Sequence, residues 1–203
     1  MTTPTDPDVD WTPYNRAQTG RSVRALALTA LQLAGPGAGR SAVELGSGAG
    51  IEARELARHG WRVHTFDADP DSEVAMREAA PEITTVEHTV CRLEELSHVP
   101  ANDLTLACVS LPFLPRESFD AVWRLAVDAL RPGGVLAVDL FGDRDGWAGA
   151  GGTFLTRAEV EHLVDCLDVV SLVEVERDGR SFSGRKHWHT YELVARTPGH
   201  QDC

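Results

Sequence analysis

Apolar residues are arranged along the chain in two alternating patterns, short continuous runs and longer stretches with helical spacing. The continuous runs predict buried β-strands at residues 41–45, 62–66, 83–90, 103–109 and 135–141. The helical spacing predicts helices at residues 21–34, 51–59, 70–80, 119–130 and 157–166. Two more runs, at residues 169–175 and 187–195, have no helix between them, so we expect them to pair antiparallel.

The order of these elements predicts the fold class. Strands that alternate with helices favour an α/β fold, a three-layer sandwich whose mostly parallel seven-stranded sheet ends in an antiparallel hairpin. In such a fold, ligands bind at the C-terminal ends of the strands, near the switch point beside the first strand. The 203 residues are enough for one domain with a real core. We expect this domain over residues 11–196, with an N-terminal lid and helix at 11–34 and flexible ends at 1–10 and 197–203.

Two of the predicted helices carry capping signals at their first residues. Asp69 and Pro70 have the residue types of an N-cap and a first helical position. Thr156 and Glu159 have the spacing of a capping box. We therefore expect helices to begin at these two points.

Composition and charge narrow the class of protein. With 19 Lys and Arg against 31 Asp and Glu, the formal charge is −12, which disfavours nucleic acid as a partner because the chain lacks a surplus of cations for phosphates. No run approaches the roughly 18 apolar residues of a membrane span. The first residues lack the basic and apolar parts of a secretion signal, which predicts a cytoplasmic protein. The four cysteines have no C-x-x-C spacing, so we predict no metal site.

A glycine-rich segment, Glu44-Leu45-Gly46-Ser47-Gly48-Ala49-Gly50, closes the first strand and opens a helix. Glycine tolerates positive φ and, without a Cβ, lets the backbone lie against a ligand. Three glycines at alternate positions exceed what a turn alone needs, so we infer a bound ligand. A dinucleotide fingerprint would need a further glycine where the chain has Ile51, and no phosphate-binding G-K-[ST] sequence follows.

An acidic residue, Asp67, ends the second strand, 17 residues beyond Gly50. A carboxylate at this place can accept hydrogen bonds from both hydroxyls of a ribose, as in nucleotide-binding α/β folds. A solvated acid in a turn is the alternative interpretation.

Together these residues resemble a known family. The pattern E-x-G-x-G-x-G after the first strand, Asp67 after the second and Leu130-Arg131-Pro132-Gly133-Gly134 before the fifth are similar to the class I S-adenosylmethionine-dependent methyltransferases, whose fold is Rossmann-like. The similarity covers about residues 11–196. Within that superfamily, the segment LARHGWRVHTFDADP resembles small single-domain members that include the tellurite-resistance-type methyltransferases.

The resemblance implies a site for S-adenosylmethionine. Gly46, Gly48 and Gly50 would lie against its adenosine and methionine parts. Glu44 would help to hold the methionine amino group, and Asp67 would bind the ribose. The rest of the implied cofactor site consists of Ser47, Ala68, Leu93 and Val109.

The chain departs from the family pattern after the third strand. An acid there often contacts the adenine amino group in the family, but this chain has Arg92. Adenine could then be held by backbone groups, by Leu93 or by a displaced acid such as Glu94.

The acceptor side is expected near the later strands and the N-terminal segment. Transfer of a methyl group from a sulfonium needs positioning and exclusion of water, and no nucleophilic side chain of the enzyme. Leu111 and Phe113 follow the fourth strand and are candidates for the acceptor pocket, or for a plain turn packed on the core. Trp147 after the fifth strand is a third candidate. Trp11 and Tyr14 are candidates for a lid that also contacts the acceptor, or for docking on the core.

A general base is needed only if the acceptor loses a proton. Strand alternation puts His187, His189 and Tyr191 on one face and Trp188 on the other. We predict His187 and His189, with Tyr14 from the lid, as catalytic candidates, with structural histidines as the alternative.

Three acids, Asp139, Asp143 and Asp145, cluster in the sequence at the end of the fifth strand. Solvation and pairing with Arg144 are the first interpretation, with acceptor contact or a Mg²⁺ site as alternatives.

These observations favour a methyltransferase that uses S-adenosylmethionine and acts on a small-molecule acceptor. Two alternatives stay open. The chain could bind S-adenosylmethionine and catalyse another reaction, such as a cyclisation or decarboxylation, or it could bind the cofactor without catalysis. A nicotinamide-dependent oxidoreductase is disfavoured by Ile51.

Overall fold

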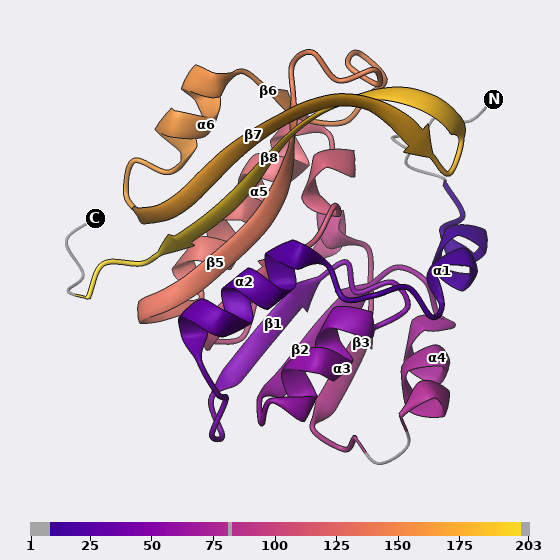
Figure 1. Cartoon of the computed structure of the whole chain (residues 1–203). Helices are drawn as coiled ribbons and strands as arrows, with labels where there is room; N and C mark the ends of the chain where they lie inside the picture. The colour runs from indigo at the N-terminus through magenta and orange to yellow at the C-terminus, as the bar shows by residue number, and fades with distance from the viewer. Residues whose placement is uncertain (1–8, 81–82, 200–203) are drawn as a thin grey trace.

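The computed structural model describes residues 9–80 and 83–199 of the chain. Its strands form one eight-stranded sheet of order β3-β2-β1-β4-β5-β8-β7, and β6 pairs with β5 beside this path (Figure 1). The strands are β1 (Ser41–Leu45), β2 (Arg62–Asp67), β3 (Val86–Val90), β4 (Asn102–Ala107), β5 (Leu130–Gly142), β6 (Phe154–Leu155), β7 (Asp168–Ser181) and β8 (Gly184–Arg196). The helices are α1 (Thr12–Gln18), α2 (Ala25–Ala34), α3 (Ile51–Arg58), α4 (Ser72–Ala79), α5 (Arg116–Asp128) and α6 (Arg157–Leu163), with the 3₁₀ turns η1 (Leu93–Glu95) and η2 (Leu111–Phe113).

The topology confirms the predicted α/β class. Strands β1 to β6 pair in parallel, whereas β8 pairs antiparallel with both β5 and β7. The sheet therefore has the seven predicted strands plus the two-residue β6. Strand β1 lies between β2 and β4, so the sheet extends from β1 in two directions, through β2 and β3 on one side and through β4 and β5 on the other. The switch point therefore lies at the C-terminal ends of β1 and β4.

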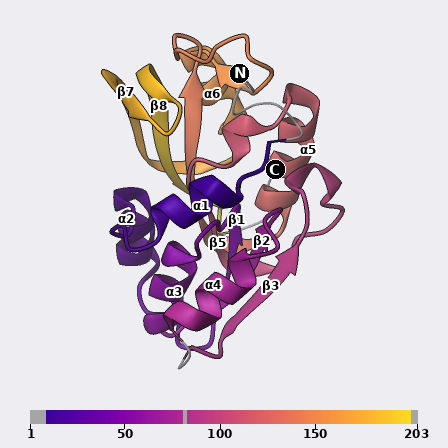
Figure 2. The same cartoon turned by 90° about the vertical axis from the view of Figure 1, so that its right-hand side faces the viewer.

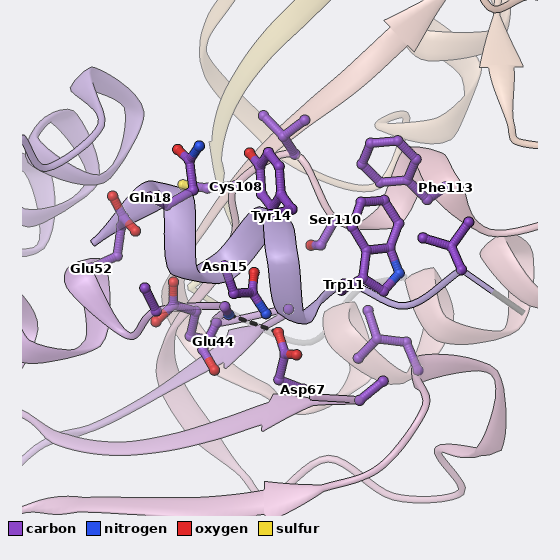
Figure 3. Close-up of a pocket in the computed structure, with 18 of the residues that line it drawn as sticks. Trp11, Tyr14, Asn15, Gln18, Glu44, Glu52, Asp67, Cys108, Ser110 and Phe113 are labelled. Carbon is purple, nitrogen blue, oxygen red and sulfur yellow. Dashed lines mark hydrogen bonds between the residues drawn. The ribbon is translucent and has the colours of Figure 1, made fainter. Parts of the chain in front are cut away.

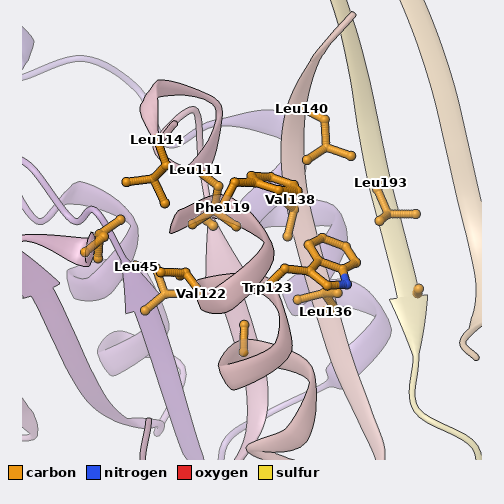
Figure 4. Close-up of a cluster of buried hydrophobic side chains, with 14 of the residues drawn as sticks. Leu45, Leu111, Leu114, Phe119, Val122, Trp123, Leu136, Val138, Leu140 and Leu193 are labelled. Carbon is orange, nitrogen blue, oxygen red and sulfur yellow. The ribbon is translucent and has the colours of Figure 1, made fainter. Parts of the chain in front are cut away.

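Helices cover both faces of the sheet and form the expected three layers (Figure 1). On one face, α2 and α3 pack on β1, β2 and β4 around the fully buried Trp61 and Leu56. On the other face, α5 places Phe119, Val122 and Trp123 against the buried side chains of β5 (Figure 4). Apolar residues of β5 alternate between these two clusters, which explains why its sequence is a continuous apolar run.

Three local predictions are corrected by the structure. The helix expected from Asp69 and Pro70 begins at Ser72, and Asp69 instead accepts the backbone N–H of Asp71 at 3.0 Å in a turn before it. The third strand begins at Val86, three residues later than predicted. The hairpin strands are longer than their apolar runs, because polar residues continue the pairing to Ser181 and Gly184. The capping box of Thr156 and Glu159 is confirmed.

The predicted flexible ends lie mostly outside the described residues, which exclude 1–8 and 200–203. Within the described part, the backbone of Thr197 exchanges hydrogen bonds with Gly133 and Gly134, so the ordered chain continues past residue 196. No helix between residues 9 and 199, leaving out 81–82, is long and apolar enough to cross a bilayer.

Candidate functional site

The glycine turn after β1 forms one wall of a cavity at the switch point. Gly46 and Gly48 have φ of 77° and 49° and line this cavity. A Cβ on Gly46 would collide with Ser110, and one on Gly48 would lie 2.8 Å from Asn15 Oδ1, so both positions need glycine. Gly50, predicted to touch the ligand, does not line the cavity. Its missing side chain instead makes room for Met76 of α4, so its role is packing.

Asp67 connects the glycine turn to the end of β2 and faces the same cavity. Its carboxylate accepts the backbone N–H of Gly48 at 2.7 Å and that of Asp69 at 2.9 Å (Figure 3). Burial raises the pKa of Asp67 above its usual range. The carboxylate is thus held in place by the loop it supports, with lone pairs left for a ligand.

Glu44 lies one residue before the end of β1 and is 1% exposed. Its Oε2 has no hydrogen-bond partner among the described residues, although the side chain lines the cavity. Burial, helped by the nearby Glu52, raises the pKa of Glu44 well above its usual range. The carboxylate accepts one hydrogen bond, from the backbone of Ala53, so Oε2 is the buried acceptor that is costly unless a ligand donates to it.

Two arginines before α2 face Glu44 across the cavity and were not assigned to the site from the sequence. Arg21 donates to both carboxylate oxygens of Glu52 at 2.6 Å, and the backbone of Arg24 donates to the same carboxylate at 2.9 Å. Burial acts to raise the pKa of Glu52, but the hydrogen bonds and positive charges of Arg21 and Arg24 together outweigh it and keep that pKa below its usual range. The Nε atoms of both arginines are buried without a partner in the described part of the chain. The only sequence signal for them was their position just before a helix that borders the glycine turn.

The cavity is narrow, about 150 Å³, and holds anionic and cationic groups with unused hydrogen-bonding capacity. Four of the predicted cofactor residues, Ser47, Ala68, Leu93 and Val109, also line it. Arg92 reaches its rim and pairs with Glu94 at 3.3 Å. This arrangement suits a ligand with a zwitterionic end and a hydroxyl-bearing ring.

Val109 marks the border between this cavity and a wider one. Its φ of 56° is a left-handed conformation that a β-branched residue rarely adopts. The wider cavity, about 790 Å³, shares Val109, Phe113, Trp11 and Tyr14 with the narrow one. Such conformations persist where the surrounding structure enforces them, often at ligand sites.

The wide cavity contains most of the residues predicted for the acceptor. Trp11, Tyr14, Phe113 and Trp147 all line it. Leu111 does not. Its side chain is fully buried in the core beside α5, because η2 turns it inward, and the prediction of an acceptor contact for Leu111 is wrong.

Helix α1 covers the border of the two cavities. It lies between the tip of the β7–β8 hairpin and the α3–α4 side of the molecule (Figures 1 and 2). The ring of Trp11 is 4.8 Å from that of Phe113, and the ring of Tyr14 is 5.7 Å from that of Phe182 at the hairpin tip. Asn15 donates to Asp69 at 2.9 Å. A lid function for this segment stays a prediction.

The structure does not bring the predicted catalytic histidines to either of these cavities. His189 is fully buried, accepts the backbone N–H of Arg144 at Nδ1 and has Nε2 2.9 Å from Glu174. Both of its ring nitrogens are therefore engaged in holding the loop after β5. His187 lies on the hairpin with its nitrogens 2.8 Å from Asp178 and 3.1 Å from Glu176, which raise its pKa.

The acids after β5 separate in space instead of forming one cluster. Asp139 lines the wide cavity, Asp143 is half-exposed, and Asp145 is buried in an ion pair with Lys186 at 2.6 Å. Within residues 9–80 and 83–199, no three His, Cys, Asp or Glu side chains are placed to hold a metal ion. The interpretation of these acids as one Mg²⁺ site is thus not supported.

A mostly parallel seven-stranded sheet with a C-terminal antiparallel hairpin, a glycine turn after β1 and an acid after β2 defines the class I S-adenosylmethionine-dependent methyltransferase fold. Residues 42–134 match the family described as a methyltransferase domain. This part of the chain is therefore similar to methyltransferase domains, and the whole chain has the fold of this class. No curated protein sequence matches the chain.

Solved structures support the fold at low sequence identity. TehB from Haemophilus influenzae is 14% identical with a TM-score of 0.77, covering 92% of this chain and 66% of that chain. The 1,6-didemethyltoxoflavin-N1-methyltransferase of Burkholderia thailandensis, determined with its acceptor and S-adenosylhomocysteine, is 18% identical with a TM-score of 0.68, covering 92% and 82%. The [4+2]-cyclase SpnF is 15% identical with a TM-score of 0.65, covering 85% and 80%.

Proposed function

We propose that the protein binds S-adenosylmethionine in the narrow cavity and transfers its methyl group to a small-molecule acceptor in the wide one. The observation that carries this proposal is the buried carboxylate of Glu44 beside the glycine turn and Asp67, whose Oε2 has no hydrogen-bond partner among the described residues. The ammonium group of the cofactor is the donor that such a carboxylate lacks.

The residues around the narrow cavity fit the parts of this cofactor. Asp67 has free lone pairs for ribose hydroxyls, and the backbone of Gly46 and Gly48 lies open to the cavity. The buried Nε atoms of Arg21 and Arg24 are donors for a carboxylate. When bound, S-adenosylmethionine supplies an electrophilic methyl group on a sulfonium.

The protein's own contribution to such a transfer is positioning and exclusion of water. The two cavities meet at Val109 and Phe113, so an acceptor in the wide one has direct access to the narrow one. The aromatic rings of Trp11 and Tyr14 on α1 cover this junction. A lid that holds both reactants in line and keeps water away accelerates a displacement without any enzyme nucleophile.

One alternative is supported by a specific observation. SpnF, a structural neighbour, is a cyclase, so the fold also hosts reactions other than methylation. For this chain we favour methyl transfer, because the methyltransferase family match covers the cofactor-side strands and the wide cavity adjoins them.

The reaction is tested with S-adenosylmethionine labelled in its methyl group and the small-molecule fraction of a cell extract. We expect label in an extracted product together with an equal amount of S-adenosylhomocysteine. A protein that binds the cofactor and consumes an extract component without transferring label would contradict methyl transfer and support the cyclase-type alternative.

A further inference from the structure

Asp139 is a carboxylate at the junction of the two cavities that the proposed function does not yet use. It lies near the C-terminal end of β5, is 8% exposed and lines the wide cavity. Its carboxylate accepts a hydrogen bond from the backbone of Val109, which borders both cavities. Asp139 is therefore placed where an acceptor would meet the cofactor.

Burial, together with the charged groups around Asp139, brings the pKa of this carboxyl group close to neutrality. Burial raises its pKa to about 7, Arg24 opposes this, and Glu192 and Glu52 reinforce it. Glu192 lies directly opposite on β8, and the buried thiol of Cys108 also interacts with Asp139. A carboxyl group with a pKa near neutrality is effective in accepting and releasing protons.

The walls of the wide cavity are rich in aromatic rings and balanced in charge. Seven aromatic residues line it: Trp11, Tyr14, Phe113, Phe141, Trp147, Phe182 and Trp188. Its three acids, Asp10, Asp139 and Glu192, are matched by three arginines, Arg24, Arg177 and Arg180. Flat rings and a balanced charge suit an uncharged aromatic molecule.

A buried lysine already occupies the cation-binding faces of three of these rings. The ammonium of Lys186 lies 3.6 Å from the ring centre of Trp188, 3.8 Å from that of Trp147 and 4.5 Å from that of Phe141. It also pairs with Asp145 at 2.6 Å. Because a cation on a ring face uses the attraction of that ring, these rings are poorly suited to bind a second cation. The aromatic walls therefore disfavour a permanently cationic acceptor.

We propose that Asp139 is the general base for methyl transfer to an uncharged, planar aromatic or heteroaromatic acceptor that carries an N–H or O–H group. This inference rests on the proposed function and adds the acceptor class and the proton acceptor. The acceptor nitrogen or oxygen forms a bond to the methyl carbon while the carbon–sulfur bond breaks and its electron pair stays on sulfur. The acceptor proton passes to the carboxylate of Asp139, and from there to water. The products are the methylated acceptor and S-adenosylhomocysteine.

The test measures cofactor binding and methyl transfer separately, on the full chain. Titration calorimetry with S-adenosylhomocysteine establishes the cofactor site in the wild type and in Asp139→Asn. Planar probes (lumazine, benzimidazole and 8-hydroxyquinoline) and aliphatic amines (ethanolamine and putrescine) are then offered with methyl-labelled S-adenosylmethionine. Asp143→Asn is the matched control, since this aspartate directly after β5 lines neither cavity.

We expect transfer to at least one planar probe and none to the amines. With that probe, wild-type kcat/KM should rise with pH up to about 7, where the base becomes deprotonated, and then level off. Asp139→Asn should bind S-adenosylhomocysteine as the wild type does, but its kcat/KM should fall roughly 10²–10⁴-fold and should no longer rise with pH. Asp139→Glu should keep part of the wild-type kcat/KM.

Each contrary result has a defined meaning. Transfer to the amines alone, or neither binding nor methylation of any planar probe while S-adenosylhomocysteine binds, would overturn the acceptor class. An Asp139→Asn variant with wild-type kcat/KM and pH profile would overturn the general base. Absence of S-adenosylhomocysteine binding in the wild type would instead overturn the proposed function.

Discussion

At the scale of single residues, the binding role that we propose for Glu44 comes with a penalty for stability. Oε2 of its buried carboxylate has no hydrogen-bond partner among the described residues, and burial raises the pKa of Glu44 well above the usual range. The folded state therefore prefers the protonated form. The penalty is absent at low pH, where the unfolded chain is also protonated, and is fully present once the pH exceeds the folded pKa.

We predict that Glu44→Gln stabilises the ligand-free protein and weakens cofactor binding. Removal of an unsatisfied buried charge should raise the unfolding free energy by about 1–3 kcal/mol at neutral pH, which is several degrees in Tm. Thermal unfolding with and without S-adenosylhomocysteine measures both effects. A lower Tm for ligand-free Glu44→Gln than for the wild type would contradict this account.

The raised pKa of Asp139 leads to a second prediction at the residue scale, on the pH dependence of the unfolding free energy. Its pKa rises from 3.8 in the unfolded chain to about 7 in the fold, so the folded state binds the proton more tightly. The contribution of Asp139 to stability therefore falls as the pH rises from about 4 to 7 and is constant above, with a total change of up to about 4 kcal/mol.

Denaturant unfolding of the wild type and Asp139→Asn at pH 5 and pH 8 checks this dependence. The wild type should lose more stability than the variant between the two values. Equal losses would show that Asp139 titrates normally in the folded protein.

The residues show which parts of the site can be predicted from sequence. Asp67 and the glycine turn could be singled out from the sequence because each is tied to the end of a strand, a local pattern, and their contacts with a ligand stay predictions. Arg21 was not assigned to the site, because a surface position beside a helix was the favoured interpretation and its partner Glu52 is 31 residues away, so nothing local indicates that pair. Leu111 was assigned to the acceptor because a turn after a strand does not reveal which side chain η2 buries.

At the scale of elements, strand β8 also shows that local sequence does not reveal contacts set by distant parts of the chain. Alternation correctly put His187 and His189 on one face of β8 and Trp188 on the other. Which face points to the cavity is set by the pairing of β8 with β5, which places Glu192 opposite Asp139. Neighbours in sequence cannot encode that choice, so the histidines were assigned to the wrong side.

Helix α1 is attached to the body of the protein through Asp69. This carboxylate accepts from Asn15 at 2.9 Å and from Thr12 at 3.2 Å. We predict that Asp69→Ala loosens α1 and speeds dissociation of S-adenosylhomocysteine about tenfold, since loss of one charge-assisted hydrogen bond is worth about 1.4 kcal/mol or more.

Stopped-flow tryptophan fluorescence measures that dissociation rate, with Trp11 as the reporter on the lid. Asp71→Ala is the control, because its contact with Arg16 on α1 is exposed and should change the rate by less than about twofold. A rate for Asp69→Ala equal to that of the control would mean that α1 does not gate the site.

The loop after β5 is attached to the hairpin by the buried pair of Asp145 and Lys186. We predict that Asp145→Asn destabilises the protein by about 3–5 kcal/mol, because the ammonium stays buried without its counter-charge. The double variant Asp145→Asn with Lys186→Met should lose less than the sum of the two single changes.

Urea unfolding of the three variants measures this coupling. Asp165→Asn is the control, since its contact with His162 is exposed and should change stability by no more than about 0.5 kcal/mol. Additive losses would mean that the pair does not act as a unit in the folded protein.

At the scale of the whole molecule, the sheet order explains why the two cavities adjoin. The cofactor-side residues come from β1, β2 and their loops, whereas the acceptor-side walls come from β5, β8 and the hairpin tip. Strand β4 lies between these two groups, and the cavities meet at Val109, two residues after the end of β4. This layout was predictable from the alternation of strands and helices, but the reach of the hairpin over α1 was not, because polar residues form its outer half.

The central claim is that the narrow cavity binds S-adenosylmethionine through Asp67 and Glu44. The most direct test is titration calorimetry of the wild type and Asp67→Ala with S-adenosylmethionine and S-adenosylhomocysteine, with NAD as the control ligand. Binding of both sulfur compounds to the wild type, no binding of NAD, and loss of binding in Asp67→Ala are the results that the account predicts. A folded wild-type protein that binds neither compound, or an Asp67→Ala variant that binds them unchanged, would contradict it.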